Sequence, residues 1–197
     1  MLNARGRRPF MKCFRLRTKR SYELSAFLKK TRCILFDWGD TIMRDFPEFI
    51  GRMIMWPKVE ALPDVREVLE ELGSSWTLCL ATNAADSTEE LIWRALERVC
   101  LKGSFDKVYC AKNVGHRKPT PEFYIHILTD LCVRKESAIM VGDNFDTDVL
   151  GANKNGIRGI WLNEKTTEKR NGAMYKTIHE LRALPSEVVG FLDSIEK

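Results

Sequence analysis

Long hydrophobic runs, repeats and paired cysteines are missing from this 197-residue chain. No apolar stretch approaches the roughly 20 residues that a membrane-crossing helix needs, which excludes a transmembrane segment. No repeat or long low-complexity segment indicates a second unit, and 44% hydrophobic content is enough for one substantial core. The six cysteines lack metal-site spacing and several lie in apolar runs. We therefore expect buried thiols in a cytoplasmic protein, without structural zinc or disulfides.

Acidic residues are nearly missing from residues 1–33, which hold 11 Lys or Arg and one acid, Glu23. This part carries a net charge of +10 and the remainder −5, which together give the +5 of the chain. No apolar segment follows the Arg7-Arg8 pair, which disfavours an export signal. Three interpretations of the leader, residues 1–32, stay open. In the first, it is a disordered or wrongly extended start, with Met11 as an alternative initiator. In the second, it binds nucleic acid or an acidic membrane surface nonspecifically. In the third, it is an organellar targeting signal.

Short apolar runs alternate with stretches of helical periodicity. Runs typical of strands buried on both faces are Cys33–Phe36, Thr77–Ala81, Lys107–Cys110, Ala138–Val141 and Gly159–Leu162. Helices are predicted at Pro63–Leu72, Ser87–Val99 and Thr120–Cys132, and two more at Tyr175–Leu184 and Ser186–Ile195, separated at Pro185. This alternation predicts an α/β fold, a Rossmann-like three-layer α/β/α sandwich with a parallel sheet, over residues 33–197.

Carboxylates, a hydroxyl and an ammonium follow the points where these runs end. The segments are Asp37-Trp38-Gly39-Asp40-Thr41, Thr82-Asn83, Lys118-Pro119, and Gly142-Asp143 followed by Asp148. Asp37, Thr82, Lys118 and Asp143 are separated by 45, 36 and 25 residues. Ligands of parallel α/β sheets bind at the carboxyl ends of the strands, so these groups are expected to meet there. Their chemistry outlines a phosphoryl-transfer site.

The four segments, in this order, resemble the motifs of the haloacid dehalogenase (HAD) superfamily of aspartate-nucleophile hydrolases. The resemblance covers roughly residues 33–162, and its most specific part is the run from Gly142 to Ala152, closed by Gly156. It implies a Mg²⁺-dependent hydrolase, most often a phosphatase, that acts on a phosphorylated small molecule. Asp37 would attack phosphorus and form an aspartyl-phosphate, which divides one difficult hydrolysis into two easier steps.

The resemblance also implies a role for each motif residue. Mg²⁺ would be held by Asp37, the main-chain carbonyl of Gly39 and Asp143, because this ion prefers hard oxygen ligands. Asp148 would act on the metal through water or on Lys118. The phosphoryl group would be bound by Thr82, Asn83 and Lys118, and Lys118 would also neutralise charge on the nucleophile.

One position departs from the family pattern. The residue two after the nucleophile is usually an Asp that serves as general acid and base, and here it is Gly39. Such catalysis contributes roughly a hundred- to ten-thousandfold. Three interpretations remain: a slow phosphatase, a hydrolase for good leaving groups such as acyl phosphates or halides, and a non-catalytic protein that binds phosphate or a partner. Asp40 is a candidate replacement, although neighbouring side chains at a strand end tend to point in opposite directions.

Little room is left for a cap domain, which indicates a small-cap or capless member. Between the first two motifs, only about residues 43–62 are not needed for the predicted helix and strand. This stretch is rich in Phe, Met and Trp and has two interpretations, a reduced lid that selects the substrate, or a hairpin or short helix packed on the core. A small lid would leave the site open to a macromolecular substrate or to cover by a neighbouring subunit.

Overall fold

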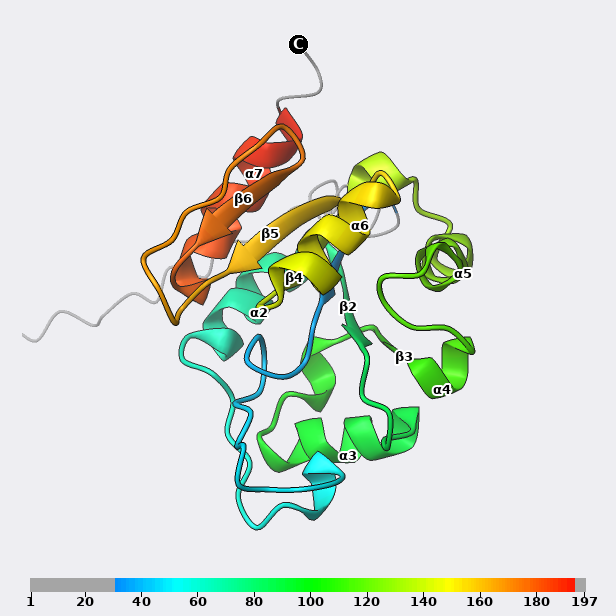
Figure 1. Ribbon diagram of the computed structural model, residues 1–197, viewed down its shortest axis with the longest axis vertical. Helices are drawn as coiled ribbons and strands as arrows, with labels where there is room; N and C mark the ends of the chain where they lie inside the picture. Colours follow the sequence, from blue (N-terminus) through cyan, green and yellow to red (C-terminus); the bar gives the residue numbers. More distant parts are fainter. Residues whose placement is uncertain (1–30, 194–197) are drawn as a thin grey trace, which may run out of the picture.

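A parallel six-stranded sheet forms the centre of the molecule in the computed structural model, which describes residues 31–193 (Figure 1). The strands are β1 (Cys33–Phe36), β2 (Thr77–Thr82), β3 (Lys107–Cys110), β4 (Ala138–Gly142), β5 (Arg158–Leu162) and β6 (Tyr175–Ile178). Their order is β3-β2-β1-β4-β5-β6. Successive strands are therefore added on one side of β1 and then, from β4 onward, on its other side. The point where the strand order reverses, the switch point at which such sheets bind ligands, lies between β1 and β4. The basic leader, residues 1–32, lies outside the described range except for residues 31 and 32, so its interpretations stay predictions.

Helices cover both faces of the sheet. The longer ones are α2 (Val65–Gly73), α3 (Glu89–Arg98), α5 (Pro121–Leu131) and α7 (Leu184–Asp193), and α4 (Ala111–Val114) and α6 (Gly151–Lys154) are single turns. Short 3₁₀ turns are η1 (Met53–Met55), η2 (Lys102–Ser104), η3 (Lys135–Ser137) and η5 (Leu181–Ala183), and η4 (Phe145–Leu150) is a π-helical turn. In residues 31–193, no helix is long and apolar enough to cross a bilayer.

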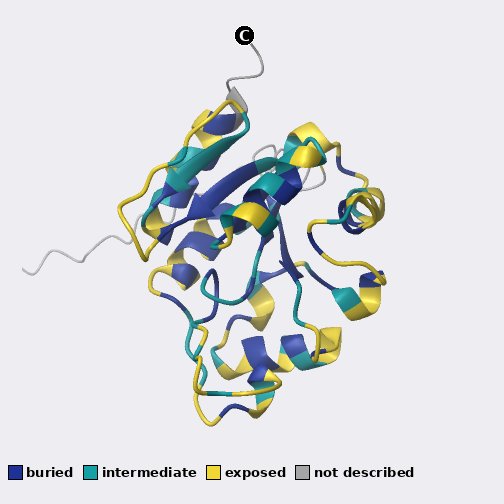
Figure 2. Cartoon of the chain, viewed as in Figure 1, coloured by how far each residue is buried: buried dark blue, intermediate teal, exposed yellow. Residues whose placement is uncertain are grey.

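Most of the sheet is buried (Figure 2). Alternation along the strands divides the buried core into two layers. Ile34 and Phe36 of β1 pack with residues of α2, α3 and α7, whereas Cys33 and Leu35 pack with α5 and α6. Strands such as β1 and β4 are therefore buried on both faces, as expected for a parallel sheet between helices, whereas the edge strand β6 buries only Ile178. The predicted α/β/α sandwich is confirmed.

Capping and patterning explain where the helices begin. Thr88 precedes α3, and its side-chain oxygen accepts a hydrogen bond from the main-chain N–H of Leu91, while Glu89 and Glu90 favour the positive end of the helix dipole. In α5, Pro121 occupies the first turn, where its missing N–H is not needed. These signals lie within two residues of the predicted helix starts.

The C-terminal prediction is wrong between Tyr175 and Ile178, which form strand β6 rather than part of a helix. This segment pairs in parallel with β5 at the edge of the sheet, and Lys176 reaches Glu187 of α7 at 2.8 Å. The pairing with β5 overrides a helical pattern read from a short window. Pro185 lies in the first turn of α7, where proline is tolerated, and does not separate two helices.

The expectation of buried thiols holds for only part of the described cysteines. Cys33, Cys79 and Cys110 lie buried in strands, whereas Cys100 and Cys132 are exposed. The exposed pair follows α3 and α5 at φ angles of 57° and 53°, where the chain turns away from the helix. Their position after a helix end, rather than in an apolar run, accounts for the difference.

We predict that Gly159→Ala lowers the free energy of unfolding by about 1–3 kcal/mol, because a methyl group there overpacks the core. A Cβ at this position of β5 would lie 2.7 Å from Cγ1 and 3.1 Å from Cα of Val149 in η4. Gly103→Ala is the matched control, since a Cβ there meets nothing within 4 Å. Urea unfolding of both variants measures the difference, and equal stabilities would contradict the close approach of β5 to η4.

Candidate active site

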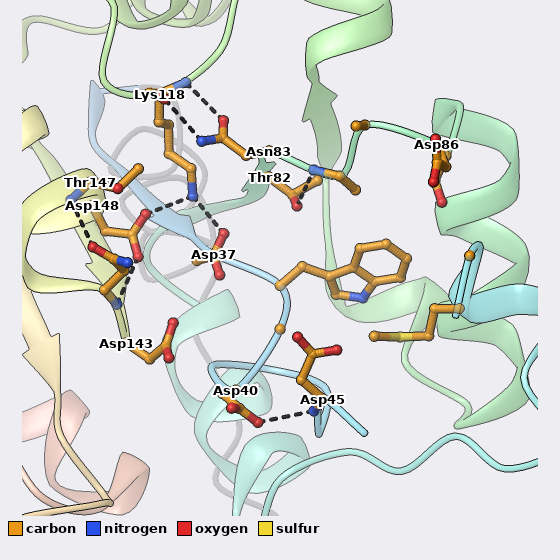
Figure 3. Close-up of a pocket in the computed structure, with 18 of the residues that line it drawn as sticks. Asp37, Asp40, Asp45, Thr82, Asn83, Asp86, Lys118, Asp143, Thr147 and Asp148 are labelled. Atoms are coloured by element: carbon orange, nitrogen blue, oxygen red, sulfur yellow. Dashed lines mark hydrogen bonds and ion pairs between the residues drawn. The ribbon is translucent and has the colours of Figure 1, made fainter. Parts of the chain in front are cut away.

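The four motif segments meet at the carboxyl edge of the sheet, around a cavity of about 410 Å³ (Figure 3). Asp37 directly follows β1, Thr82 ends β2 and Asp143 directly follows β4, so the three side chains are placed by neighbouring strands. Lys118 comes from the loop between α4 and α5, and Asp148 from η4. All five residues line the cavity. The arrangement places them on both sides of the switch point.

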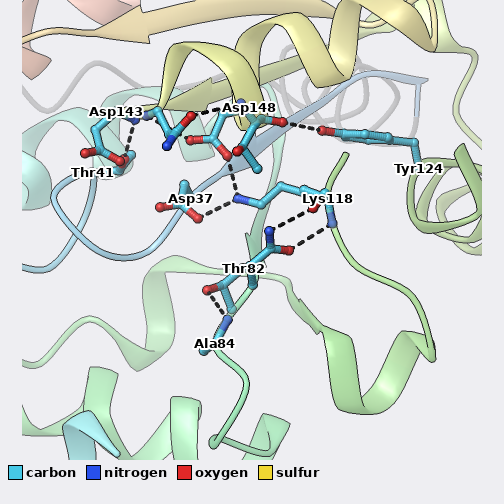
Figure 4. Close-up of polar contacts among 11 residues, drawn as sticks. Asp37, Thr41, Thr82, Ala84, Lys118, Tyr124, Asp143 and Asp148 are labelled. Atoms are coloured by element: carbon cyan, nitrogen blue, oxygen red, sulfur yellow. Dashed lines mark hydrogen bonds and ion pairs between the residues drawn. The ribbon is translucent and has the colours of Figure 1, made fainter. Parts of the chain in front are cut away.

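A buried lysine holds two of the carboxylates. The ammonium of Lys118 lies 2.5 Å from Oδ1 of Asp37 and 2.8 Å from Oδ1 of Asp148 (Figure 4). Its side chain is only 1% exposed. Burial acts to lower the pKa of Lys118, but Asp37 and Asp148 outweigh burial and raise it. The lysine therefore stays charged and fixes the direction of the Asp37 carboxylate.

Asn83 holds the main chain of Lys118 in place. Its side-chain oxygen accepts a hydrogen bond from the N–H of Lys118 at 2.8 Å, and its side-chain amide donates to the Lys118 carbonyl at 2.9 Å. Both amide atoms thus position the lysine. Asn83 also lines the cavity, and its contact with substrate stays a prediction.

Two threonines lie at the strand ends. Oγ1 of Thr82 accepts a hydrogen bond from the N–H of Ala84 at 3.1 Å, which leaves the hydroxyl hydrogen for donation. Oγ1 of Thr41 accepts one from the N–H of Asp143 at 3.1 Å and is fully buried. Thr41 therefore ties the loop after β1 to the loop after β4 (Figure 4). Sequence reasoning gave Thr41 no role, although its place in the first motif was a signal.

The π-helical turn η4 fixes Asp148. Oδ2 of Asp148 accepts a hydrogen bond from the N–H of Asn144 at 3.2 Å, and the Asn144 side chain accepts one from the N–H of Thr147 at 2.9 Å. The Asp148 carboxylate packs directly on Gly142, where a Cβ would collide with it. Burial raises the pKa of Asp148 to about 6, although the Lys118 ammonium acts in the opposite direction.

Asp37, Asp143 and Asp148 form a group that fits a divalent cation. One carboxylate oxygen of each lies within 4.8 Å of the others. Burial, and next the charge of Asp37, raise the pKa of Asp143. A cation next to these carboxylates would offset both effects. Three hard oxygens at this spacing suit the ligand preferences of Mg²⁺.

Asp40 points to a different set of partners. Its Oδ2 pairs with the Lys165 ammonium at 2.7 Å, and its Oδ1 accepts a hydrogen bond from the N–H of Asp45 at 2.9 Å. Burial acts to raise the pKa of Asp40, but the Lys165 hydrogen bond and charge lower it. Lys165 also lies 3.4 Å from Asp143, and its place after β5 had given no signal of this.

Residues 43–62 form an irregular segment with one short turn, η1. Met43 pairs with Ala61 at its base, and the rings of Phe46, Phe49 and Trp56 contact one another. Arg98 of α3 donates hydrogen bonds to main-chain carbonyls of the segment. The segment therefore packs on the core, while its Met53 and Trp56 also line the cavity.

Comparison with known families identifies the chain. The model of the haloacid dehalogenase-like hydrolase family matches residues 20–162, which is more than half of the chain. The chain therefore belongs to this family, which confirms the resemblance carried by its four motifs.

Several curated relatives of the chain are phosphatases. It is 30% identical over 98 residues to a glyceraldehyde 3-phosphate phosphatase of Methanothermobacter thermautotrophicus, covering 47% of this chain and 43% of that protein. It is 31% identical over 103 residues to a ribulose-1,5-bisphosphate 5-phosphatase of Halopiger xanaduensis, covering 52% and 42%. An N-acylneuraminate-9-phosphatase of Rattus norvegicus is 28% identical over 127 residues, covering 61% and 50%. The chain thus spans about half the length of the curated relatives it matches.

Solved structures share the fold. A protein from Listeria monocytogenes serotype 4b, described as uncharacterized, superimposes with a TM-score of 0.72 at 23% identity, covering 81% of this chain and 98% of the other. A HAD phosphatase from Thermococcus onnurineus gives a TM-score of 0.67 at 21% identity, covering 81% and 99%.

We predict that Lys118→Met lowers the free energy of unfolding by about 3–5 kcal/mol, because it leaves the buried Asp148 and the partly buried Asp37 carboxylates without their cation. Lys107→Met is the matched control. Lys107 pairs with Asp130 at 2.6 Å, but both side chains are more than 40% exposed, so its loss costs below about 1 kcal/mol. Urea unfolding at neutral pH compares the two variants. Equal decreases in the free energy of unfolding would show that burial does not determine how much the Lys118 ion pairs contribute to stability.

Proposed function

We propose that the protein is a Mg²⁺-dependent phosphatase that uses Asp37 as nucleophile and passes through an aspartyl-phosphate. The observation that carries this proposal is the position of Asp37. Its carboxylate lies at the switch point, beside a buried ammonium and within 4.8 Å of the Asp143 and Asp148 carboxylates. A carboxylate that is held by a cation and faces a polar cavity is suited to attack phosphorus.

The surrounding residues have complementary tasks in this proposal. Lys118 offsets the charge of the phosphoryl group and of Asp37, and the Thr82 hydroxyl donates to a phosphoryl oxygen. When bound by Asp37, the carbonyl of Gly39 and Asp143, Mg²⁺ would reduce the repulsion between carboxylate and phosphate. Asp148 acts on Lys118, which it contacts directly, and its carboxylate belongs to the group that fits the cation.

The substrate class follows from the relatives. The phosphatases that the chain resembles are named for phosphorylated small molecules, and we propose the same class here. Residues 43–62 would act as a short lid on a core of residues 33–197, since Met53 and Trp56 form part of the cavity wall. Gly39 favours a second candidate, a non-catalytic protein that binds phosphate or a partner.

We predict that Asp37→Asn lowers Mg²⁺-dependent hydrolysis of acetyl phosphate and para-nitrophenyl phosphate by roughly a thousandfold or more, because the amide cannot attack phosphorus. The variant should also fail to trap a metal fluoride that wild type retains. Asp146→Asn is the control, an exposed aspartate on η4 outside the cavity wall. Wild-type protein that binds phosphate without Asp37-dependent turnover would favour the non-catalytic candidate.

We predict that Mg²⁺ raises the melting temperature of wild type and of Asp146→Asn, but not of Asp143→Asn. Saturation at about 100 times the Kd contributes about 2.7 kcal/mol, and each kcal/mol corresponds to roughly 2–4 °C in a domain of this size. Thermal unfolding with and without Mg²⁺ measures the shift and needs no substrate. An equal shift in Asp143→Asn would remove this residue from the cation site.

A further inference from the structure

The space next to Gly39 is filled by another carboxylate. A Cβ built on Gly39 would lie 3.2 Å from Oδ2 and 3.4 Å from Cγ of Asp45. The side chain that residue 39 lacks would therefore begin in tight contact with the Asp45 carboxylate. Asp45 lines the same cavity as Asp37 and Lys118, and Figure 3 shows its carboxylate turned toward the interior of that cavity.

The turn after β1 brings Asp45 to this place. The main-chain N–H groups of Ile42 and Met43 donate to the carbonyl of Trp38, and that of Asp40 donates to the carbonyl of Met43. These bonds fold the chain back over Gly39. The base is then fixed by a hydrogen bond from the N–H of Arg44 to the carbonyl of Glu60. Asp45 therefore lies next to Gly39, although the two are six residues apart in the sequence.

The Asp45 carboxylate has no paired cation. The main chain of Asp45 is fixed by its N–H, which donates to Oδ1 of Asp40. Among residues 31–193, no residue forms a hydrogen bond or ion pair with the Asp45 carboxylate. The Asp40 carboxylate, by contrast, is occupied by Lys165 and by the main chain of Asp45. Of these two neighbours, only Asp45 offers the cavity an oxygen that is available for proton transfer.

We propose that Asp45 is the general acid and base of this site and performs the task for which the family normally uses the residue at position 39. The proposal rests on the phosphatase function proposed above and supplies its missing step. The acid comes from the base of the 43–62 segment rather than from the strand end that carries the nucleophile.

Two steps balance with this residue. In the first, an oxygen of Asp37 bonds to phosphorus, the bond from phosphorus to the leaving oxygen breaks, and the Asp45 carboxyl gives its proton to that oxygen. In the second, a water oxygen bonds to phosphorus, its proton passes to the Asp45 carboxylate, and the bond from phosphorus to Asp37 breaks. Inorganic phosphate leaves, and both carboxyl groups return to their starting states.

The test compares wild type, Asp45→Asn and Asp86→Asn on phenyl phosphate and acetyl phosphate with Mg²⁺. Phenolate is a poor leaving group and needs a proton, whereas acetate leaves without one. For Asp45→Asn, we expect kcat/KM to fall by roughly a hundred- to ten-thousandfold on phenyl phosphate and to stay near wild type on acetyl phosphate. Because the second step also loses its base, phosphorylated protein should accumulate on acetyl phosphate, which intact-protein mass spectrometry detects.

Asp86→Asn is the matched control, because Asp86 is another carboxylate that lines the cavity, on its far side from Lys118 (Figure 3). Asp86→Asn should match wild type on both substrates.

A second check moves the acid to residue 39. Gly39→Asp should restore part of the phenyl phosphate rate when combined with Asp45→Ala, which removes the Oδ2 and Cγ atoms that a Cβ at residue 39 would meet at 3.2 and 3.4 Å. It should give no gain with Asp45 present, because that residue already supplies the proton.

Failures of the two proposals are distinguishable. Phosphorylation that depends on Asp37, together with an unchanged ratio of the two substrates and no accumulation in Asp45→Asn, would overturn the role of Asp45 alone. Turnover of acetyl phosphate by Asp37→Asn at the wild-type rate would overturn the proposed function, and the role of Asp45 with it.

Discussion

The contacts of the Lys118 ammonium with Asp37 and Asp148 are the interaction on which the rest of the site depends. Three elements that are distant in sequence, the end of β1, the loop before α5 and the turn η4, meet at one nitrogen atom. Removing these groups from water is costly, and the cost is offset only when all partners are present. The clamp of Asn83 on the lysine main chain and the contact of Asp148 with Gly142 maintain this geometry.

Charge around the cavity is balanced in two separate places. Lys118 pairs with Asp37 and Asp148, and Lys165 pairs with Asp40 and, at a longer distance, with Asp143. Burial raises the pKa of Asp45, and the charges of Asp40 and Asp37 act in the same direction. Acidic groups thus outnumber the two lysines that contact them. This excess is the electrostatic reason to propose a divalent cation, which would offset the repulsion between these carboxylates and a phosphate group.

Much of the fold and the positions of the motifs could be predicted from the sequence, because each depends on local pattern. Runs such as Cys33–Phe36 are buried strands, and residues that follow parallel strands must meet at one edge. Strand β6 could not be predicted in this way, since its pairing with β5 comes from tertiary contact. The nearness of Asp45 to Gly39 and the contacts of Lys165 depend on how a turn and a loop fold in space. Residues placed by strand ends are readable from the local pattern, Lys118 and Asp148 are identified through the resemblance to family motifs, and the contacts of Asp45 and Lys165 have neither signal.

The turn that returns the chain over Gly39 gives the proposed nucleophile and the proposed proton donor independent supports. Asp37 is placed by the end of strand β1, while Asp45 depends on the pairing of residues 43 and 44 with residues 60 and 61. A molecule that displaces the 43–62 segment would therefore move the donor and leave the nucleophile in place. Protonation of the leaving group would then depend on how well the substrate fits. A molecule that fits poorly would reach Asp37 but would find no proton donor for its leaving oxygen.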